Sequence, residues 1–206
     1  MTAINAPDAL HSHKPHRYPW WLAFMLTSPA RRLIENSSLV LGDIVRPGQT
    51  VLELGPGNGY FSVPIAEALG PDGKLIAIDI QPQMLRMLAR RLRKRGLDRR
   101  LVTRQTDHVE AQLGDLSNTV DLVVAINVIH ELPKPRETIL ALGNALRENG
   151  QFLLVEPKGH VSAAFHEAEL GWARESGLCP AAEQRTAGTR RWRTCLRKSP
   201  NPVTLA

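Results

Sequence analysis

Short apolar runs alternate with amphipathic segments along most of the chain. Five runs rich in β-branched residues predict strands, at residues 50–54, 74–80, 101–105, 120–126 and 150–156. Apolar residues follow one another in these runs instead of alternating with polar ones, which is typical of strands covered on both faces in a parallel sheet. The pattern therefore predicts a doubly wound α/β fold, with a mostly parallel sheet and helices on both of its faces.

Two segments between the predicted strands have the apolar spacing of helices. In Gln83–Arg95, four apolar side chains share one helical face, namely Met84, Leu85, Leu88 and Leu92. Arg136–Arg147 repeats Ile and Leu at the same period, and Gly150 just beyond it is expected to cap the helix with a left-handed backbone. We expect both segments to pack on the sheet.

The last part of the chain breaks this alternation. A helical stretch at Ala164–Glu175 is followed by two mainly polar, strand-like runs on either side of Gly188, which favours a tight turn. We therefore predict a closing antiparallel hairpin, which gives a seven-stranded sheet with a reversed last strand.

Length and composition fit one domain with short extensions. The chain has 206 residues, of which 43% are hydrophobic, enough for one sizeable core. We expect a single domain at residues 46–198, preceded by a helical cap or lid at 20–45, with flexible tails at 1–19 and 199–206. The longest wholly apolar run, residues 20–26, is far too short to span a membrane, and no secretory leader is recognisable. These features predict a cytoplasmic protein without a membrane span.

The amino-terminal region has two features of its own. Three closely spaced histidines at residues 11–16 lack cysteine or acidic neighbours, and the two cysteines of the chain lack ligand spacing, so no metal site is expected. The segment at residues 18–33 is rich in Trp and Phe with two arginines behind them. It is interpreted as a lid over an apolar acceptor, a patch that touches a membrane surface, or a helix docked on the core.

The stretch TVLELGPGNGYF, at residues 50–61, is the first candidate for chemistry. A glycine-rich turn directly after a strand lets a cofactor lie against bare backbone. A dinucleotide fingerprint would need its third glycine where Tyr60 stands, whereas here the glycines are Gly55, Gly57 and Gly59, preceded by the acid Glu53. The spacing therefore disfavours NAD.

Two further acids follow the next two strands. Asp79 ends the second strand, where a carboxylate can accept from both hydroxyls of a ribose, although a helix cap is the ordinary role of Asp at such a turn. Asp107, after the third strand, is placed to accept from an adenine amine, with a helix cap again as the competing interpretation. With Glu53 for a cationic group, these acids indicate a ligand that combines an amino acid end, a ribose and an adenine.

As a set, these motifs resemble those of class I S-adenosylmethionine-dependent methyltransferases. The segments LELGPGNG, AIDIQPQML, DLVVAINVIHEL and FLLVEPKGHV occur in the family's order. The resemblance implies S-adenosyl-L-methionine as cofactor, with Glu53 and the three glycines on its methionine part. It further implies Asp79 on the ribose, Asp107 with His108 on the adenine, and backbone at Ile126 and Asn127 completing the pocket.

The catalytic candidate follows the fourth strand. His130 lies on the expected acceptor side, and its ordinary pKa suits a general base for a hydroxyl or ammonium acceptor. A histidine that only hydrogen-bonds within its turn is the competing interpretation. Glu156 and His160, after the fifth strand, are weaker candidates on the same rim.

The acceptor is narrowed mainly by motifs that the sequence does not contain. The residues after the fourth strand read NVIH and lack the Pro-Pro-aromatic motif of enzymes that methylate exocyclic amines of bases. Enzymes that methylate cytosine at C5 need a nucleophilic cysteine directly after a proline, whereas Cys179 precedes its proline. Both classes are disfavoured. The formal charge of +6 favours an anionic partner, but the basic cluster at residues 86–104 lies largely on the outer face of a helix without aromatic interleaving. We therefore expect a small-molecule methyl acceptor, with an RNA methyltransferase and a non-catalytic S-adenosylmethionine-binding sensor or partner subunit as alternatives. The atom methylated and the oligomeric state stay open at this point.

Overall fold

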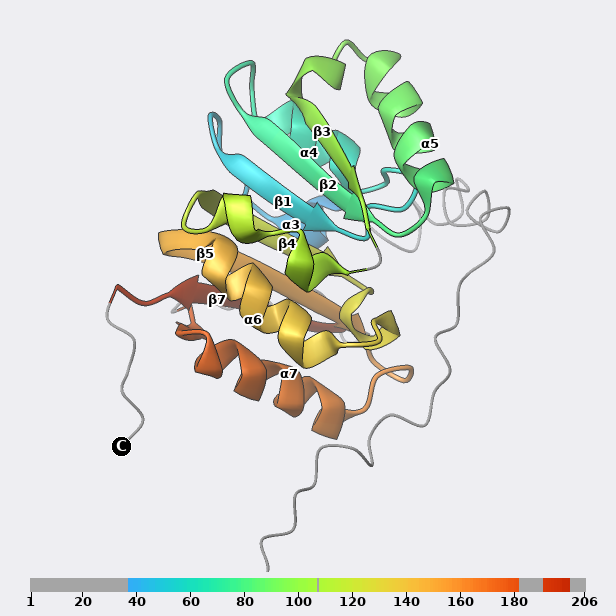
Figure 1. Cartoon of the computed structure of the whole chain (residues 1–206). Coiled ribbons are helices and arrows are strands. Elements are labelled where there is room, and N and C mark those ends of the chain that lie inside the picture. The colour runs from blue at the N-terminus through green and yellow to red at the C-terminus, as the bar shows by residue number, and fades with distance from the viewer. Residues whose placement is uncertain (1–36, 107, 182–190, 201–206) are drawn as a thin grey trace, which may run out of the picture.

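The computed structural model describes residues 37–106, 108–181 and 191–200. Their strands form one seven-stranded sheet in the order β3-β2-β1-β4-β5-β7-β6 (Figure 1). All neighbouring strands are parallel except β7, which is antiparallel to both β5 and β6. The strands are β1 (Thr50–Leu54), β2 (Lys74–Asp79), β3 (Leu101–Gln105), β4 (Val120–Ile126), β5 (Leu146–Pro157), β6 (Leu178–Pro180) and β7 (Arg191–Lys198). The predicted α/β fold with a reversed last strand is confirmed.

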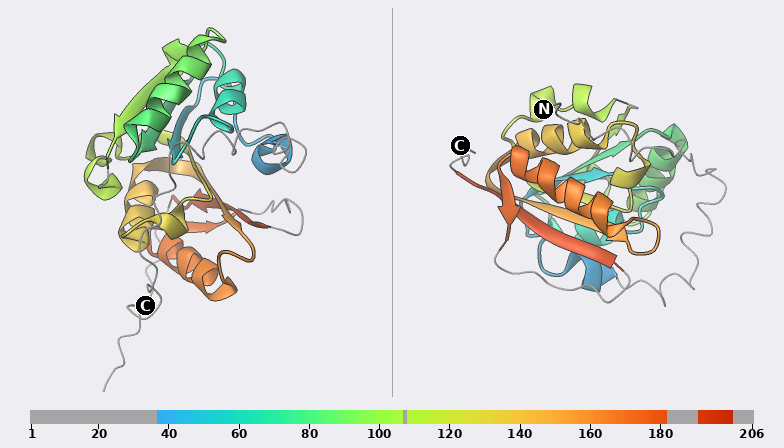
Figure 2. Two further views of the ribbon diagram at one scale, coloured as in Figure 1. Left: turned by 90° about the vertical axis from the view of Figure 1, so that its right-hand side faces the viewer. Right: turned by 90° about the horizontal axis from the view of Figure 1, so that it is seen from below.

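Helices cover both faces of this sheet (Figures 1 and 2). One face carries α3 (Ser37–Leu41), α4 (Ser62–Ala68) and α5 (Pro82–Arg93), and the other carries α6 (Pro135–Ala145) and α7 (Ala163–Glu175). Short 3₁₀ turns connect these elements at η3 (Asp98–Arg100), η4 (Val109–Ala111), η5 (Gly114–Leu116) and η6 (Ile129–Glu131). The arrangement is a three-layer sandwich with the sheet in the middle.

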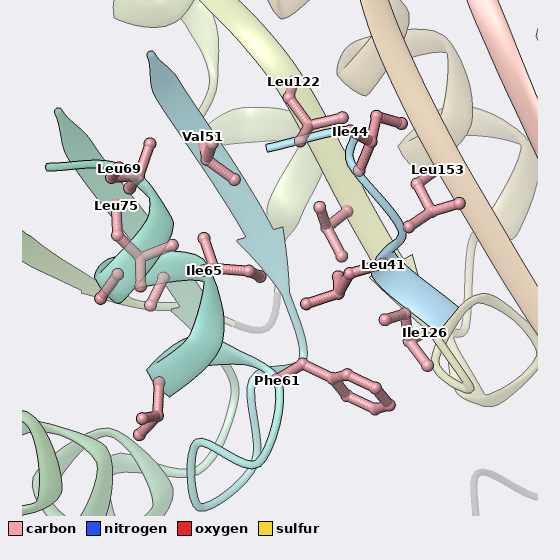
Figure 3. Close-up of a cluster of buried hydrophobic side chains, with 14 of the residues drawn as sticks. Leu41, Ile44, Val51, Phe61, Ile65, Leu69, Leu75, Leu122, Ile126 and Leu153 are labelled. Atoms are coloured by element: carbon pink, nitrogen blue, oxygen red, sulfur yellow. The ribbon is translucent and has the colours of Figure 1, made fainter. Parts of the chain in front are cut away.

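Alternate residues of the central strands enter two separate cores. In β1, the side chain of Val51 packs with α3 and α4, whereas Leu52 packs with the opposite cluster beneath α6 and α7. Both are fully buried, because successive side chains of a strand point to opposite faces. Figure 3 shows the first cluster, in which Phe61 and Ile65 of the α4 segment lie over the sheet. This double burial explains the continuous apolar runs of the sequence.

Helix α5 agrees with its amphipathic pattern. Its buried residues are the four predicted ones, Met84, Leu85, Leu88 and Leu92. Pro82 stands at the first helical position, where its fixed φ suits the helix and its missing N–H removes no helical hydrogen bond.

The end of α6 differs from the prediction. The helix stops at Ala145 and β5 already begins at Leu146, with a register shift opposite Val120 and Leu122. The left-handed residue is Asn149 (φ +61°), so the predicted cap at Gly150 was wrong. Glycine is needed at 150 for space, since a Cβ there would lie 2.8 Å from the Arg147 carbonyl oxygen.

The closing hairpin is present as the antiparallel pair β6 and β7, in which Cys179 faces Arg197. Its predicted turn at Gly188, the amino-terminal segments 1–19 and 20–36, and Asp107 lie outside the described residues. Within the described part of the chain, no helix combines the length and the apolar character that crossing a membrane requires.

Candidate active site at the carboxyl edge of the sheet

The glycine-rich turn between β1 and α4 begins the site. Gly55, Gly57 and Gly59 all have left-handed backbone, with φ of +63°, +54° and +88°. The Gly55 N–H donates to the Ile78 carbonyl at 2.8 Å, which ties the start of the turn to β2. The three glycines are therefore required by the conformation of the turn itself.

Space around the three glycines differs. A Cβ at Gly55 would lie 2.6 Å from the Val128 side chain, and one at Gly59 would lie 2.7 Å from Leu88. A Cβ at Gly57 would meet no described atom within 4 Å. The outer two glycines thus allow close packing, whereas Gly57 exposes bare backbone to open space where a ligand can approach.

Glu53 lies beneath this turn. Its side chain is 3% exposed, and no described residue gives Oε2 a hydrogen bond. Burial raises the pKa of Glu53 to about 7, the Ser62 hydroxyl offsets part of this rise, and the charge of Asp79 adds to it. A buried carboxylate oxygen without a donor is costly, so the residues present suit a cationic or hydrogen-bonding ligand group at this position.

Asp79 ends β2 on the same face of the sheet as Glu53. Its Oδ1 accepts the Gln81 backbone N–H at 2.8 Å, and the Gly57 backbone also donates to the carboxylate. Burial raises the pKa of Asp79 to about 6, and these two hydrogen bonds lower it only in part. Asp79 therefore helps to shape the turn into α5 and borders the glycine turn, but it is not the helix cap of the competing interpretation, because the N-cap of α5 is Gln81 and no side chain caps it.

The other predicted pocket residues are less enclosed. Asn127 follows β4 with left-handed backbone (φ +55°), and its Oδ1 accepts from Arg191 of β7 at 3.1 Å. His108 is exposed, and its backbone N–H donates to Thr106 Oγ1 at 3.0 Å. The structure thus places Asn127 near the glycine turn through its neighbour Val128, and it leaves His108 at the surface.

His130 forms the most definite polar contact on the acceptor side. Its Nδ1 lies 2.6 Å from Glu156 Oε2, and Glu156 Oε1 accepts the backbone N–H groups of Ile129 and His130 at 3.0 and 3.3 Å. Because the carboxylate only accepts, the neutral imidazole carries its proton on Nδ1, which leaves Nε2 as the basic atom. Burial opposes the charged form, but the hydrogen bond and charge of Glu156, followed by the charge of Glu131, raise the pKa of His130 above its ordinary value.

Glu156 differs from its predicted placement on the rim. It is the second-last residue of β5, and its side chain is fully buried below His130. His160 does stand beside the catalytic candidate, with its ring 5.0 Å from that of His130 in an edge-to-face arrangement. The structure therefore makes Glu156 the partner of His130 instead of an independent candidate.

Two polar residues of α7 complete the buried network and were not singled out from the sequence. Glu169 is fully buried and its Oε2 lies 2.9 Å from His166 Nδ1, while His166 Nε2 lies 3.2 Å from Thr194 Oγ1. The only sequence signal is the three-residue spacing of His166 and Glu169, which places both on one side of a helix.

Other candidates give no second site. Among the described residues, no group of three or more His, Cys, Asp or Glu side chains could hold a metal ion. The basic residues of the α5 segment, including Arg93 and Lys94, are exposed on the outer side of that helix, as the sequence pattern indicated.

Curated proteins similar to this chain include methyltransferases with different acceptors. Malonyl-(acyl-carrier protein) O-methyltransferase from Anoxybacillus flavithermus is 33% identical over 130 residues, which is 63% of this chain and 46% of that protein. A mitochondrial ribosomal RNA small subunit methyltransferase from Arabidopsis thaliana is 27% identical over 135 residues, which is 64% of this chain and 33% of that protein. The chain thus spans less than half the length of these relatives.

A solved structure and a family model agree with this similarity. A crystal structure of a SAM-dependent methyltransferase from Aquifex aeolicus matches with a TM-score of 0.74 at 20% identity, over 88% of this chain and all of that one, which supports the fold. The family model described as a methyltransferase domain matches residues 52–152, from β1 through the glycine turn, β4 and α6 into β5. Residues 52–152 are therefore a methyltransferase domain, and the relatives and the solved structure together support a class I S-adenosylmethionine-dependent methyltransferase.

Proposed function

We propose that this chain binds S-adenosyl-L-methionine at the glycine turn and transfers its methyl group to a small-molecule acceptor. One observation carries the proposal: the buried Glu53 Oε2 has no hydrogen-bond partner among the described residues, next to open space at Gly57. An ammonium group in that space would give the carboxylate the counter-charge that the chain itself does not provide. A ligand without a donor group at this position would leave Oε2 without a hydrogen bond, and a neutral donor would supply the hydrogen bond but no counter-charge.

The remaining pocket residues follow from the family's arrangement. We assign the methionine part to Glu53 and the glycine turn, the ribose to Asp79, and the adenine to Asp107 with His108. The backbone after β4, at Asn127, would border the same pocket. The cofactor supplies the methyl group on a sulfonium, which is already an activated electrophile.

His130 is proposed as the general base for the acceptor. Its Nε2 is the basic atom because Glu156 holds the proton on Nδ1. The loop that carries His130 also carries Val128, which contacts the glycine turn at Gly55, so base and cofactor loop lie on neighbouring elements. An acceptor hydroxyl or ammonium between them would be deprotonated and aligned by the same loop.

The acceptor is proposed to be a small molecule, apolar or aromatic in part. The Trp-rich cap at residues 20–45 would close over it, and residues 46–198 would form the catalytic domain between tails at 1–19 and 199–206. We propose a cytoplasmic location. By their names, the relatives act on acceptors as different as a malonyl-(acyl-carrier protein) and ribosomal RNA, so they favour no single class of acceptor.

An RNA acceptor is the second candidate, because exposed cations cluster along the α5 segment. Phosphate contacts would make RNA binding weaken steeply with salt. Binding that falls at least tenfold between 50 and 200 mM salt, on the order expected for several phosphate contacts, and that is further weakened in Arg93→Glu with Lys94→Glu, would favour this candidate. If RNA does not bind, or if its binding responds neither to salt nor to the charge-reversal variant, the small-molecule acceptor is favoured instead. A folded protein that binds cofactor but turns over no acceptor would indicate a sensor.

Gly57→Ala tests the cofactor cradle. The added Cβ enters the open space beside the turn, so we expect affinity for S-adenosylmethionine to fall about tenfold or more, a change of roughly 1.4 kcal/mol. Calorimetric titration with S-adenosylmethionine, S-adenosylhomocysteine and NADH would measure this, with binding expected only for the first two. Gly48→Ala is the matched control, because Gly48 also has positive φ (+79°) and open surroundings but precedes β1 at its other end. Equal affinity losses in both variants would contradict the assignment.

Glu53→Gln tests the charge beneath the turn. The folded pKa of Glu53 is raised from 4.5 to about 7, so its contribution to stability is present below pH 4.5 and is lost as pH rises through 7. We expect Glu53→Gln to remove up to about 3 kcal/mol of this pH dependence from the unfolding free energy of the ligand-free protein. Urea denaturation from pH 4 to pH 8 would measure it.

The same carboxyl predicts proton release on cofactor binding. A cation beside Glu53 favours its ionised form, so at pH 6 binding should release up to one proton and affinity should rise towards pH 7. Calorimetry in two buffers of different ionisation enthalpy counts the protons. Release that persists in Glu53→Gln would assign it to another group.

His130→Ala tests the base. Formation of S-adenosylhomocysteine with an acceptor found by screening hydroxyl, amine and thiol compounds should fall about 10²–10⁴-fold, the usual contribution of a general base. Cofactor affinity should stay within about twofold. In the unmodified protein, kcat/KM should rise with pH through a pKa above the ordinary histidine value, because His130 must be neutral to accept a proton. Unchanged turnover would reduce His130 to a structural histidine.

A further inference from the structure

Two fully buried carboxyl groups, those of Glu156 and Glu169, lie close enough to interact directly, and the first contacts His130. Glu156 comes from β5 and Glu169 from α7, and both side chains are inaccessible to water. They meet because alternate residues of β5 face α7, as Phe152 and Leu154 do in the same cluster. Two adjacent carboxylates in a low-dielectric site repel strongly, so one of the pair keeps its proton.

The hydrogen bonds decide which carboxyl is the anion. Glu156 receives three donors, namely two backbone N–H groups and His130 Nδ1. Among the described residues Glu169 has a single donor, His166 Nδ1 at 2.9 Å from its Oε2, while none donates to its buried Oε1. Since three donors stabilise a negative charge far better than one, Glu156 is the anion and Glu169 is the acid.

We propose that Glu169 is a positioning residue for the His130–Glu156 pair: as a neutral carboxylic acid, it donates a hydrogen bond to Glu156 and keeps that carboxylate ionised and aimed at His130 Nδ1. The inference rests on the proposed role of His130 as a base. It gives Glu169 Oε1 a partner, because a proton on this oxygen can be donated to the neighbouring carboxylate. Burial first, and the Glu156 charge next, raise the pKa of Glu169 to about 9, in agreement with a neutral acid at physiological pH.

The partners on the far side fit the same direction of donation. Burial lowers the pKa of His166, so its ring is neutral with one proton. With that proton on Nδ1, His166 donates to Glu169 Oε2 and accepts from the Thr194 hydroxyl at Nε2, at 3.2 Å. The Trp192 ring stacks on His166 with centroids 5.2 Å apart and fixes its plane. Each donor in the chain then points towards Glu156.

Several charged groups surround this network and stay the same in every variant proposed below. Those that face His130 or His166 from the packed elements are Glu131, Lys158, His160 and Glu167. Substitutions at 169 alone therefore isolate the contribution of its carboxyl.

Glu169→Gln and Glu169→Leu form a matched pair. Glutamine copies the protonated acid, since its amide can donate to Glu156 and accept from His166, whereas leucine keeps the bulk and loses the donor. The first readout is the titration of His130 by NMR of histidine ring C–H signals in the full chain, assigned with His130→Gln. We expect Glu169→Gln to leave the His130 midpoint within about 0.3 pH units, because a neutral acid is replaced by a neutral amide. If Glu169 were ionised, its replacement by glutamine would remove a negative charge and lower the His130 midpoint by about one pH unit or more. That result would overturn the proposal.

The second readout is turnover. Loss of a hydrogen bond to a buried charge predicts that Glu169→Leu lowers kcat about tenfold or more, with the KM for cofactor within twofold and most activity retained in Glu169→Gln. Equal activity of the two variants would make Glu169 a packing residue only. Should Glu169→Leu fail to fold, the titration of Glu169→Gln still decides the charge state. If His130→Ala retains full turnover while Glu169→Gln leaves the His130 titration unchanged, His130 is not the base. The hydrogen bond from a neutral Glu169 to Glu156 would still be supported.

Discussion

Burial of the central strands on both faces is the constraint that decides where this protein places its polar chemistry. Side chains within β1, β2, β4 and β5 alternate between two apolar cores, so a charged group in mid-strand would lie far from water. Glu53, Asp79 and Glu156 all stand at the last or second-last position of their strands. There a carboxylate is buried and still reaches N–H groups of the loops at this edge of the sheet, as Glu156 of β5 does with η6, which follows the neighbouring strand β4.

The same alternation separates two kinds of chemistry. Glu53 and Asp79 point to the face covered by α4 and α5, where the glycine turn leaves open space. Glu156 points to the opposite face, where α7 supplies its buried neighbour Glu169. A position two residues along a strand stays on one face and a position one residue along changes it, so strand register alone assigns each acid to its layer.

Much of this arrangement could be predicted from the sequence because double burial has a periodic signature. The strand limits of β1 and β4 and the buried face of α5 follow directly from apolar spacing. The early start of β5 could not be predicted, since Leu146–Asn149 is mostly polar and joins the sheet across a register shift. Local spacing also favoured Gly150 as the left-handed residue, whereas close packing against a neighbouring carbonyl requires the glycine there and Asn149 takes the turn.

The part of the candidate site that could be predicted consists of residues in local sequence motifs. Glu53 and Asp79 belong to short motifs whose residues are adjacent in sequence, and His130 follows a predicted strand. Glu169 gave no such signal, because a glutamate on a helix is normally solvated and only its partner from another element shows that it is buried. Long-range polar pairs of this kind become visible only when the layers are assembled.

The contact between Gly55 and Val128 connects the two layers at the edge of the sheet. Val128 stands between Asn127, which follows β4 and accepts from Arg191, and His130, whose imidazole belongs to the buried network of the other face. A Cβ at Gly55 would overlap Val128, so the glycine turn and the loop after β4 must be set in place together. The carboxylate of Glu156 accepts from two backbone N–H groups of that loop, so the group that orients the His130 imidazole also fixes the loop against which the glycine turn packs. The orientation of the His130 ring and the position of the loop beside the glycine turn therefore both depend on the buried carboxylate oxygen atoms of Glu156.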